Sequence, residues 1–525
     1  MRRETISPRA AAELTALLSV LAIAAWNPAT DAATVTVKTE SGLLSGAAPT
    51  AGVTAYLGIP YAAPPVGELR WKPPEPALRW DGIRKADTFG TSCMQNQAGS
   101  RLPWTEEFMT QGPIGEDCLF LNVWTAARAP NGRVPVMLWI YGGGFNEGSS
   151  SVAVYDGTEL AKKGVIVVSV NYRVGPLGFL THPELTQESE HRSSGNYGLL
   201  DQIAALRWVR DNIAAFGGDP NQVTIFGQSA GALSVAALMR SPLARGLFAR
   251  AIAQSGPGLL GRNALGAGST LSDREAAGLK YAESKGAHSL AELRALPAAA
   301  FFTPAGGRGG TPAPNGIVRD GWVLSDTAPA EQVPVMVGFV ADDIGVAGSA
   351  AGARPAVATY KSDAERIYGD QAAAFMKLYP AGSDTDVPVA QKSAARDRIR
   401  VAVDLWAAEQ SRSSKRLYTY FFDRVIPWPA HPEFGAFHTS EVPYVFNTIA
   451  RINRPWEPVD KTVAEAASSY WANFARKVDP NGPGLPRWAA YDANTHMTMQ
   501  IGPRTGAMRV AEPDKLQFFL AQLRK

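Results

Sequence analysis

The sequence predicts an α/β protein with one mostly parallel β-sheet. Several runs are apolar almost without interruption, which is typical of parallel strands that are buried on both faces. Helical patterns lie between these runs, so the chain is expected to return across the sheet through helical crossovers. The signals continue from about residue 53 to about residue 475 with no repeat and no clear linker. This order favours one large unit.

The individual elements follow from the spacing of the apolar residues. The clearest helical pattern covers 199–216, and a Gly-Gly-Asp-Pro sequence at 217–220 ends it. Residues 271–299 look helical and are expected to form an insertion over the sheet, whereas the Gly- and Pro-rich segment 303–316 is expected to be a surface loop. The predicted core strands are Val134–Ile140, 165–170, 223–226, 251–253, 333–337 and 417–421.

The charge balance excludes some classes of partner. The chain has 525 residues and a formal net charge of only +3. This small charge gives no reason to propose nucleic acid or a strongly charged partner. After the N-terminus, no segment is long and apolar enough to suggest a membrane span.

The N-terminus resembles a secretory signal peptide. Arg2 and Arg3 precede an apolar stretch at about 14–26, and small residues follow at Ala29, Ala32 and Ala33. We therefore expect a signal peptide within 1–33, cleaved between about 25 and 33, and a mature single domain at 34–525. The protein would then be secreted or periplasmic. The alternative interpretation is an ordinary buried helix.

The chain contains two cysteines, Cys93 and Cys118. In an oxidising compartment they could close a loop of about two dozen residues, worth about 3 kcal/mol from loop entropy. Two free buried thiols remain the alternative.

A Gly-x-Ser-x-Gly motif at 227–231 carries the strongest chemical signal. A β-branched and aromatic run at 222–226 precedes it, and a helical pattern at 232–239 follows it. A strand, a sharp turn and a helix form the context in which this motif presents a nucleophilic serine, here Ser229. The alternative is a simple turn rich in Gly, Ser and Ala.

A nucleophilic serine needs a base and an acid that orients the base. In this type of site the acid and the histidine follow the serine in that order. His438 lies in a small, flexible segment after the last strong strand and is the preferred base, whereas His431 looks like a turn residue. Asp342 and Asp343 both follow a predicted strand between the serine and the histidine, so either can be the acid.

Three glycines at 142–144 directly follow a predicted strand. Backbone N–H groups of such a run can turn toward a developing oxyanion without side-chain clashes. The N–H of Ala230, the residue after the serine, would add a donor. A phosphate-binding loop is the rival interpretation, but no Gly-Lys-Ser/Thr sequence follows the glycines.

Together these segments resemble the type-B carboxylesterase/lipase family, which includes cholinesterases and bacterial para-nitrobenzyl esterases. The resemblance covers roughly 35–520 and implies an α/β-hydrolase fold with helices on both faces of a mostly parallel sheet. The motifs that carry it are 56–62 (YLGIPYA), 116–119 (EDCL), 141–145 (YGGGF), 171–173 (NYR), 227–231 (GQSAG) and 435–441 (GAFHTSE).

The resemblance implies a role for several residues. Ser229 would be the nucleophile and His438 the general base, and Ser255 would support the acid. It also implies a disulfide between Cys93 and Cys118 at the mouth of the active-site gorge. The remaining implied sets are an oxyanion hole formed by Gly143, Gly144 and Ala230, and two buried ion pairs, Arg70–Glu116 and Arg173–Asp201.

One motif departs from the family pattern. In the family the catalytic acid is the Glu of a Gly-x-Asn-x-x-Glu-Gly motif, whereas the sequence of this chain from Gly338 to Ile344 is Gly-Phe-Val-Ala-Asp-Asp-Ile. Counting from Gly338 makes Asp343 the acid, with Asp342 as the alternative. Cholinesterases have a glutamate before the serine, and the neutral Gln228 in its place argues against choline esters.

The sequence thus predicts a secreted serine carboxylic-ester hydrolase that forms an acyl-enzyme on Ser229 and needs neither a metal nor a cofactor. Its partner would be a small-molecule ester. Two alternatives remain open: a lipase-like hydrolase of long-chain or bulky natural-product esters, such as those of mycotoxins, and a non-catalytic binding relative. Neither the physiological ester nor the oligomeric state follows from the sequence.

Overall fold

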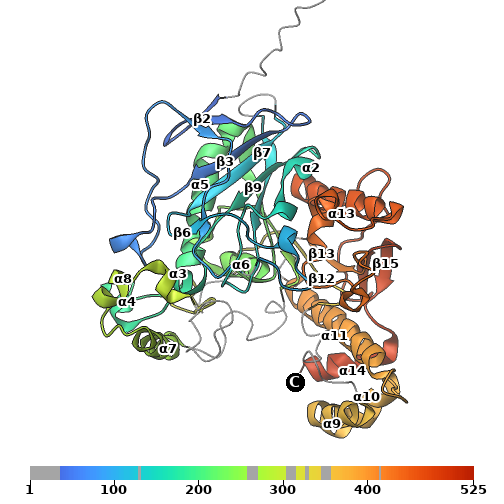
Figure 1. Ribbon diagram of the computed structural model, residues 1–525. Helices are drawn as coiled ribbons and strands as arrows, with labels where there is room; N and C mark the ends of the chain where they lie inside the picture. The colour runs from blue at the N-terminus through green and yellow to red at the C-terminus, as the bar shows by residue number, and fades with distance from the viewer. Residues whose placement is uncertain are drawn as a thin grey trace, which may run out of the picture.

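A ten-stranded β-sheet forms the centre of the molecule in the computed structural model (Figure 1). The predicted signal peptide lies outside the described residues, and the predicted loop at 303–316 lies almost entirely outside them. The structure describes residues 36–97, 99–127, 132–256, 270–302, 315–325, 330–343, 356–412 and 416–524.

The strands of this sheet pair in the order β15-β14-β13-β12-β11-β10-β8-β9-β7-β3. All pairs from β9 to β14 are parallel, and the outer pairs at both edges are antiparallel. The predicted mostly parallel sheet is therefore confirmed. The strands are β3 (Thr54–Pro60), β7 (Phe120–Thr125), β8 (Val134–Ile140), β9 (Ile166–Val170), β10 (Gly218–Gln228), β11 (Arg250–Gln254), β12 (Val335–Val340), β13 (Leu417–Phe422), β14 (Met497–Ile501) and β15 (Gly506–Arg509).

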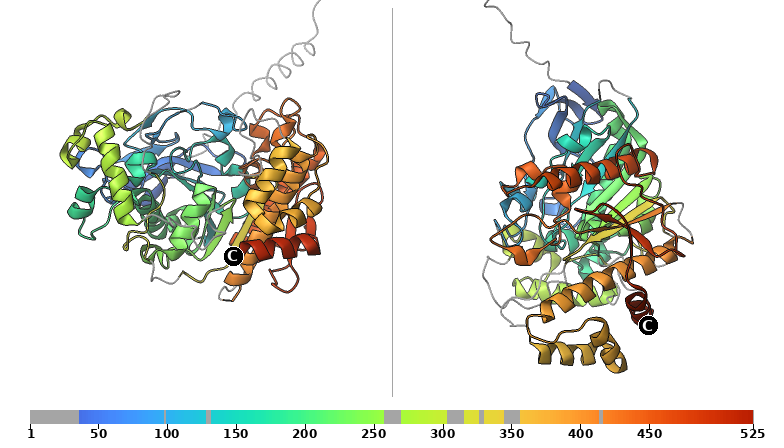
Figure 2. Two further views of the ribbon diagram at one scale, coloured as in Figure 1. Left: turned by 90° about the horizontal axis from the view of Figure 1, so that it is seen from below. Right: turned by 90° about the vertical axis from the view of Figure 1, so that its right-hand side faces the viewer.

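Helices cover both faces of the sheet. On one face, α5 (Tyr197–Asn212) and α6 (Ala230–Arg240) pack against β10. On the other, α13 (Pro458–Lys477) packs against β8 and β10 (Figure 2). The helical pattern predicted at 199–216 continues after α5 as a 3-10 turn, and Gly217, with φ of 87°, ends it in the left-handed conformation that glycine adopts without strain.

The other helices lie around this core. The predicted insertion at 271–299 contains two helices and the start of a 3-10 turn, separated by non-helical residues. Two small sheets flank the main one, with the strand orders β1-β2-β4 and β5-β6. These further helices and strands are α2 (Thr158–Ala161), α3 (Gly175–Phe179), α4 (Pro183–Glu188), α7 (Leu271–Ser284), α8 (Leu290–Ala295), α12 (Val442–Val445), β1 (Thr36–Thr39), β2 (Gly42–Gly46), β4 (Ile83–Ala86), β5 (Ser92–Cys93) and β6 (Ile114–Gly115).

A helical lobe at one end of the molecule has an apolar cluster of its own (Figures 1 and 2). It contains α9 (Val357–Tyr368), α10 (Ala372–Leu378), α14 (Pro513–Leu523) and the first part of α11 (Val387–Gln410). The second half of α11 continues from this lobe onto β12 and β13 of the main sheet. Thus α11 connects the lobe to the strands that precede Asp343 and His438.

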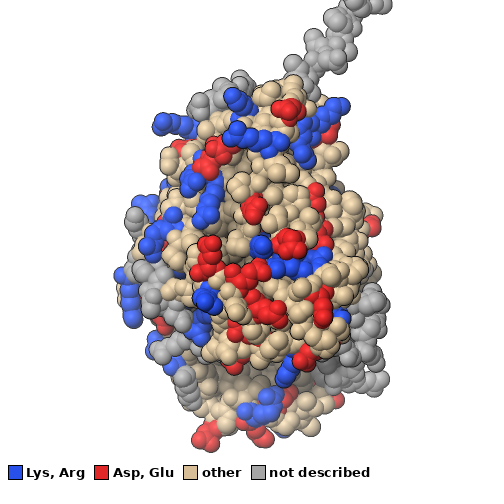
Figure 3. Space-filling view, turned by 90° about the vertical axis from the view of Figure 1, so that its left-hand side faces the viewer, with Lys and Arg blue, Asp and Glu red and all other residues tan. Residues whose placement is uncertain are grey.

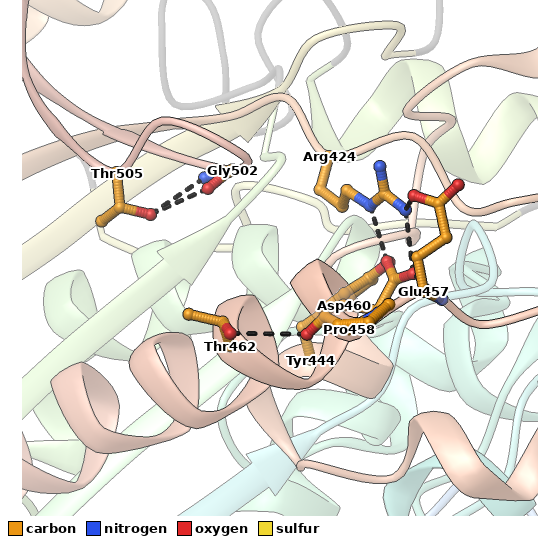
Figure 4. A network of polar contacts seen from close by, with 8 residues as sticks. All are labelled: Arg424, Tyr444, Glu457, Pro458, Asp460, Thr462, Gly502 and Thr505. Carbon is orange, nitrogen blue, oxygen red and sulfur yellow. Dashed lines mark hydrogen bonds and ion pairs between the residues drawn. The ribbon is translucent and has the colours of Figure 1, made fainter.

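A buried polar network fixes the chain just beyond β13 (Figure 4). Arg424 Nε and Nη2 donate to the two carboxylate oxygens of Asp460 at 2.6 and 2.8 Å, and the Tyr444 hydroxyl donates to Asp460 Oδ1 at 2.7 Å. Asp460 is fully buried at the start of α13. The network therefore connects the segments on both sides of His438 to one helix.

The surface shown in Figure 3 carries acidic and basic side chains interspersed over the same face, in keeping with the small net charge. Within the described ranges, none of the helices combines the length and the apolar character needed to cross a bilayer.

Candidate active site

Ser229 lies at a sharp turn between β10 and α6. Its φ of 58° and ψ of −121° place a non-glycine residue in a strained conformation, and its N–H donates to Gln254 O of β11 at 2.9 Å. Glycine at 231 is required by space, because a Cβ there would overlap the carbonyl of Ile140 in β8. The predicted strand–turn–helix context of the motif is therefore present, and it raises the serine above the carboxyl edge of the sheet.

His438 and Asp343 meet at the same edge. Asp343 follows β12 and His438 follows β13, and these strands are neighbours that run in parallel. His438 Nδ1 lies 2.5 Å from Asp343 Oδ1, with both side chains buried. A carboxylate at this nitrogen leaves Nε2 free of the proton, which is the tautomer that a general base needs.

The other ring nitrogen of His438 faces the side chain of Gln228. Gln228 Nε2 lies 3.1 Å from His438 Nε2. Among the described residues, no hydrogen bond joins the Ser229 hydroxyl to His438, although both residues line one cavity. Catalytic hydrogen bonds are often loose before substrate binds. The same Gln228 nitrogen lies 3.4 Å from Nδ1, so the amide lies against the imidazole ring, near both of its nitrogens.

Asp342, the alternative acid, has different partners. Its Oδ1 accepts from Arg396 Nη2 at 2.6 Å, and its Oδ2 accepts from the backbone N–H of Ala436 at 2.8 Å. The geometry thus favours Asp343 over Asp342 as the residue that orients His438.

The glycine loop after β8 lies directly against the serine. A Cβ on Gly142 would lie only 2.9 Å from Ser229 Cβ, and Gly143 has a φ of 108°. The N–H groups of Gly143 and Gly144 donate no hydrogen bond within the described part of the chain. Ala230 is the first residue of α6, and an N–H at this helix position has no intrahelical acceptor. The three predicted donors therefore have unused N–H groups, and Gly143 and Gly144 line the same cavity as Ser229. Their role as an oxyanion hole stays a prediction.

Ser255 lies at the end of β11 and is fully buried, with a φ of 49°. Its backbone N–H donates to Gly338 O at 2.8 Å, but its hydroxyl has no partner among the described residues. Its expected support of the acid stays a prediction.

The cavity next to Ser229 has a volume of about 590 Å³. Its lining is mixed: apolar rings such as Phe108 and Phe302 alternate with amide side chains and one ion pair, Arg101–Glu147 at 2.5 Å. The amide side chains are Gln95, Asn96, Gln97, Asn146 and Gln228.

A disulfide joins Cys93 to Cys118, and the loop that it closes lines part of the cavity. Within this loop, Trp104 Nε1 donates to His438 O at 3.1 Å and to Thr439 Oγ1 at 3.0 Å. The loop therefore also contacts the backbone that carries the proposed base. No signal in the sequence distinguishes Trp104 from an ordinary packing residue.

Both ion pairs that the resemblance implied are present. Arg70 binds Glu116 through two nitrogens at 2.7 Å each, and Arg173 binds Asp201 at 2.7 and 2.8 Å. Two-point pairs of this kind hold planar geometry. Since neither pair lines the cavity, both are structural.

A further buried carboxyl lies three residues after His438. Burial raises the pKa of Glu441 to about 7, and the charge of Asp343 adds to the rise. Gln254 Nε2 donates to Glu441 Oε1 at 3.2 Å, and Trp471 Nε1 donates to Gln254 Oε1 at 3.0 Å. Although Glu441 belongs to the 435–441 motif, only the fold shows that it is buried behind the histidine.

The parallel sheet, the strained serine turn and the His–Asp pair at one edge define an α/β-hydrolase. Residues 33–519 match the model of the carboxylesterase family. The chain belongs to this family and is an ester hydrolase of the serine type.

The alignments with individual relatives cover most of each relative and most of this chain. A fumonisin B1 esterase from Sphingopyxis macrogoltabida is 37% identical over 500 residues, covering 89% of this chain and 86% of the relative. A para-nitrobenzyl esterase from Bacillus subtilis (strain 168) is 33% identical over 505 residues, covering 92% and 97%. A cocaine esterase from Homo sapiens is 32% identical over 511 residues, covering 89% and 87%.

Proposed function

We propose that the chain hydrolyses carboxylic esters through an acyl-enzyme on Ser229. The observation that carries the proposal is the Asp343–His438 hydrogen bond of 2.5 Å, because His438 lines the same cavity as Ser229. A histidine oriented in this way can accept a proton from a serine hydroxyl through its other nitrogen.

In the proposed reaction, Ser229 Oγ attacks the ester carbonyl while His438 Nε2 takes the serine proton. The N–H groups of Gly143, Gly144 and Ala230 stabilise the oxyanion. His438 then donates the proton to the leaving alcohol, and water activated by His438 releases the acid.

The lining of the cavity supports polar esters as substrates. A lipase that binds long acyl chains needs a continuous apolar surface, whereas here amide side chains and the Arg101–Glu147 pair interrupt the apolar rings. The likeness to a fumonisin B1 esterase supports a bulky natural-product ester as one candidate of this kind. A panel of esters with short alkyl, long alkyl and hydroxyl- or carboxyl-bearing acyl groups tests this preference through kcat/KM.

The exported location is part of the proposal. Disulfides persist mainly in oxidising compartments, and the structure joins Cys93 to Cys118. Cell fractionation followed by N-terminal sequencing of the mature protein tests it. The expected N-terminus lies between about residues 26 and 34, and retention of an intact Met1 in the cytoplasm would contradict export.

Substitution of the serine tests the mechanism. We expect Ser229→Ala to abolish turnover of a para-nitrophenyl ester and labelling by a fluorophosphonate, with an unchanged circular dichroism spectrum. A folded Ser229→Ala protein that still turns over the ester would refute the acyl-enzyme. Absence of labelling in the wild-type protein would favour a non-catalytic binding role.

A further inference from the structure

We propose that Asp342 is a positioning residue: it fixes the segment that carries His438 at the correct distance from Asp343. We also propose that Arg396 of α11 holds the Asp342 carboxylate in place. The inference rests on the proposed function, because it concerns the geometry of the Asp343–His438 pair. Asp342 adjoins Asp343 in the chain, but its side chain points to the histidine segment at a different place.

Two hydrogen bonds join the acid segment to the histidine segment. The N–H of Asp342 donates to Ala436 O at 2.9 Å, and the N–H of Ala436 donates to Asp342 Oδ2 at 2.8 Å. Asp342 and Phe437 form a parallel β-bridge at this point. Because Asp343 follows Asp342 and His438 follows Phe437, the same pairing sets the separation of the acid from the base.

The contact leaves no space for a larger residue. Gly435 has a φ of 62°, and a Cβ on it would overlap the Asp342 carboxylate. The histidine segment can therefore lie against the Asp342 carboxylate only because residue 435 is a glycine. A sliding movement of one segment past the other would break both hydrogen bonds to Ala436.

The charge of Asp342 is balanced from α11. The Asp342 side chain is 2% exposed, with Arg396 Nη2 at 2.6 Å and Lys392 Nζ at 4.0 Å from Oδ1. Lys392 Nζ also donates to Glu433 O, in the chain leading to His438, at 2.9 Å. One helix thus holds the acid segment through Arg396 and the histidine segment through Lys392.

The consequence concerns the chemical step. A buried carboxylate that loses its partner is strongly unfavourable, so removal of Arg396 should displace Asp342. Displacement of a catalytic group by about 1 Å can lower the rate about a hundredfold. Since Asp342 and Arg396 do not line the cavity, substrate binding should be unaffected.

The test compares three variants with one matched control. Asp342→Asn keeps an acceptor for Ala436 but loses the charge, Asp342→Ala loses both, and Arg396→Gln keeps the Asp342 carboxylate but removes its charged partner. The control is Asp397→Asn. Asp397 is the next residue of α11 and is also buried. It accepts from Tyr379 at 2.8 Å and pairs with Lys515 at 3.4 Å in the helical lobe and with Arg400 one turn further along α11, but not with the histidine segment.

We expect kcat for a para-nitrophenyl ester to fall about tenfold in Asp342→Asn and Arg396→Gln and about a hundredfold in Asp342→Ala. KM should change less than twofold. The far-downfield proton resonance of the Asp343–His438 hydrogen bond should weaken in the same order. Asp397→Asn should keep the wild-type kcat and resonance, even if it unfolds at a lower temperature.

Folded Asp342→Asn and Arg396→Gln variants with wild-type kcat and an intact resonance would overturn the inference. An equal loss of kcat in Asp397→Asn would do the same, since it would reveal a general structural effect. If Asp342→Ala does not fold, the other two variants decide. Failure of the proposed function is distinguishable, because it would appear as turnover that survives Ser229→Ala.

Discussion

Replacing Glu441 by glutamine should remove one component of the pH dependence of stability. Glu441 is fully buried behind His438, and burial raises its pKa from 4.5 to about 7. The folded protein therefore binds a proton at this site more tightly than the unfolded chain does. Its contribution to stability is complete below pH 4.5 and is lost as the pH rises through about 7.

The magnitude follows from the two pKa values. At about 1.4 kcal/mol for each pH unit, the rise from 4.5 to about 7 corresponds to about 3 kcal/mol. Most of this change falls between pH 5 and pH 8. Glutamine has nearly the same shape as the protonated acid and keeps an oxygen for the hydrogen bond from Gln254. The stability of Glu441→Gln relative to the wild-type protein should therefore increase by that amount as the pH rises.

The assay is urea denaturation of both proteins at several pH values, followed by tryptophan fluorescence. Taking the difference between the proteins at each pH cancels the contribution of the titrating groups that do not interact with Glu441. A change in the free energy of unfolding that the new amide causes at every pH shifts this difference by a constant. It is therefore separate from the effect of ionisation, which varies with pH. If the two free energies of unfolding run parallel from pH 5 to pH 8, the raised pKa of Glu441 is refuted.

Two further predictions concern the walls of the site. Gly143→Ala would place a methyl group against the Glu147 carbonyl at a φ of 108°, so we expect kcat to fall at least about a hundredfold as the oxyanion donor is lost. Stopped-flow measurement of acylation checks this, and a loss confined to KM would contradict it. The double variant Cys93→Ser/Cys118→Ser frees a loop with a sequence separation of 25, so it should lose about 3 kcal/mol of stability. Denaturant titration checks this, with the reduced wild-type protein as the control, which should be as stable as the double variant. A double variant as stable as the oxidised wild-type protein would contradict the prediction.

Much of the fold could be predicted because parallel strands leave a simple pattern. The run Val134–Ile140 forms a strand with the predicted bounds, since buried strands are apolar at every position. By contrast, the antiparallel strand β15 and the helix α9 are partly exposed, and their mixed patterns do not distinguish them from loops. Their conformations depend on β14 and on the apolar cluster of the lobe.

The candidate site could be predicted as far as local motifs reach. Ser229 and the glycine loop each lie in a motif of a few residues, and chain order selected His438. The choice between Asp342 and Asp343 was different, because both follow the same strand. Counting along the family motif from Gly338 favoured Asp343. The pairing of Asp342 with Ala436 and Arg396, on two other segments, supports that choice from the fold. The contacts of Gln228 and Trp104 with His438 likewise join distant parts of the chain.

These long separations along the chain affect the order in which the parts of the active site form during folding. Asp343 and His438 are 95 residues apart, and Gln228 and His438 are 210 residues apart. Contacts of such high sequence separation are slow to form, because a long loop must be closed first. A chain folded only as far as β11 would contain the serine turn and the glycine loop but no base. Ester hydrolysis is therefore a readout of complete folding, and activity regained on dilution from denaturant should lag behind the recovery of secondary structure.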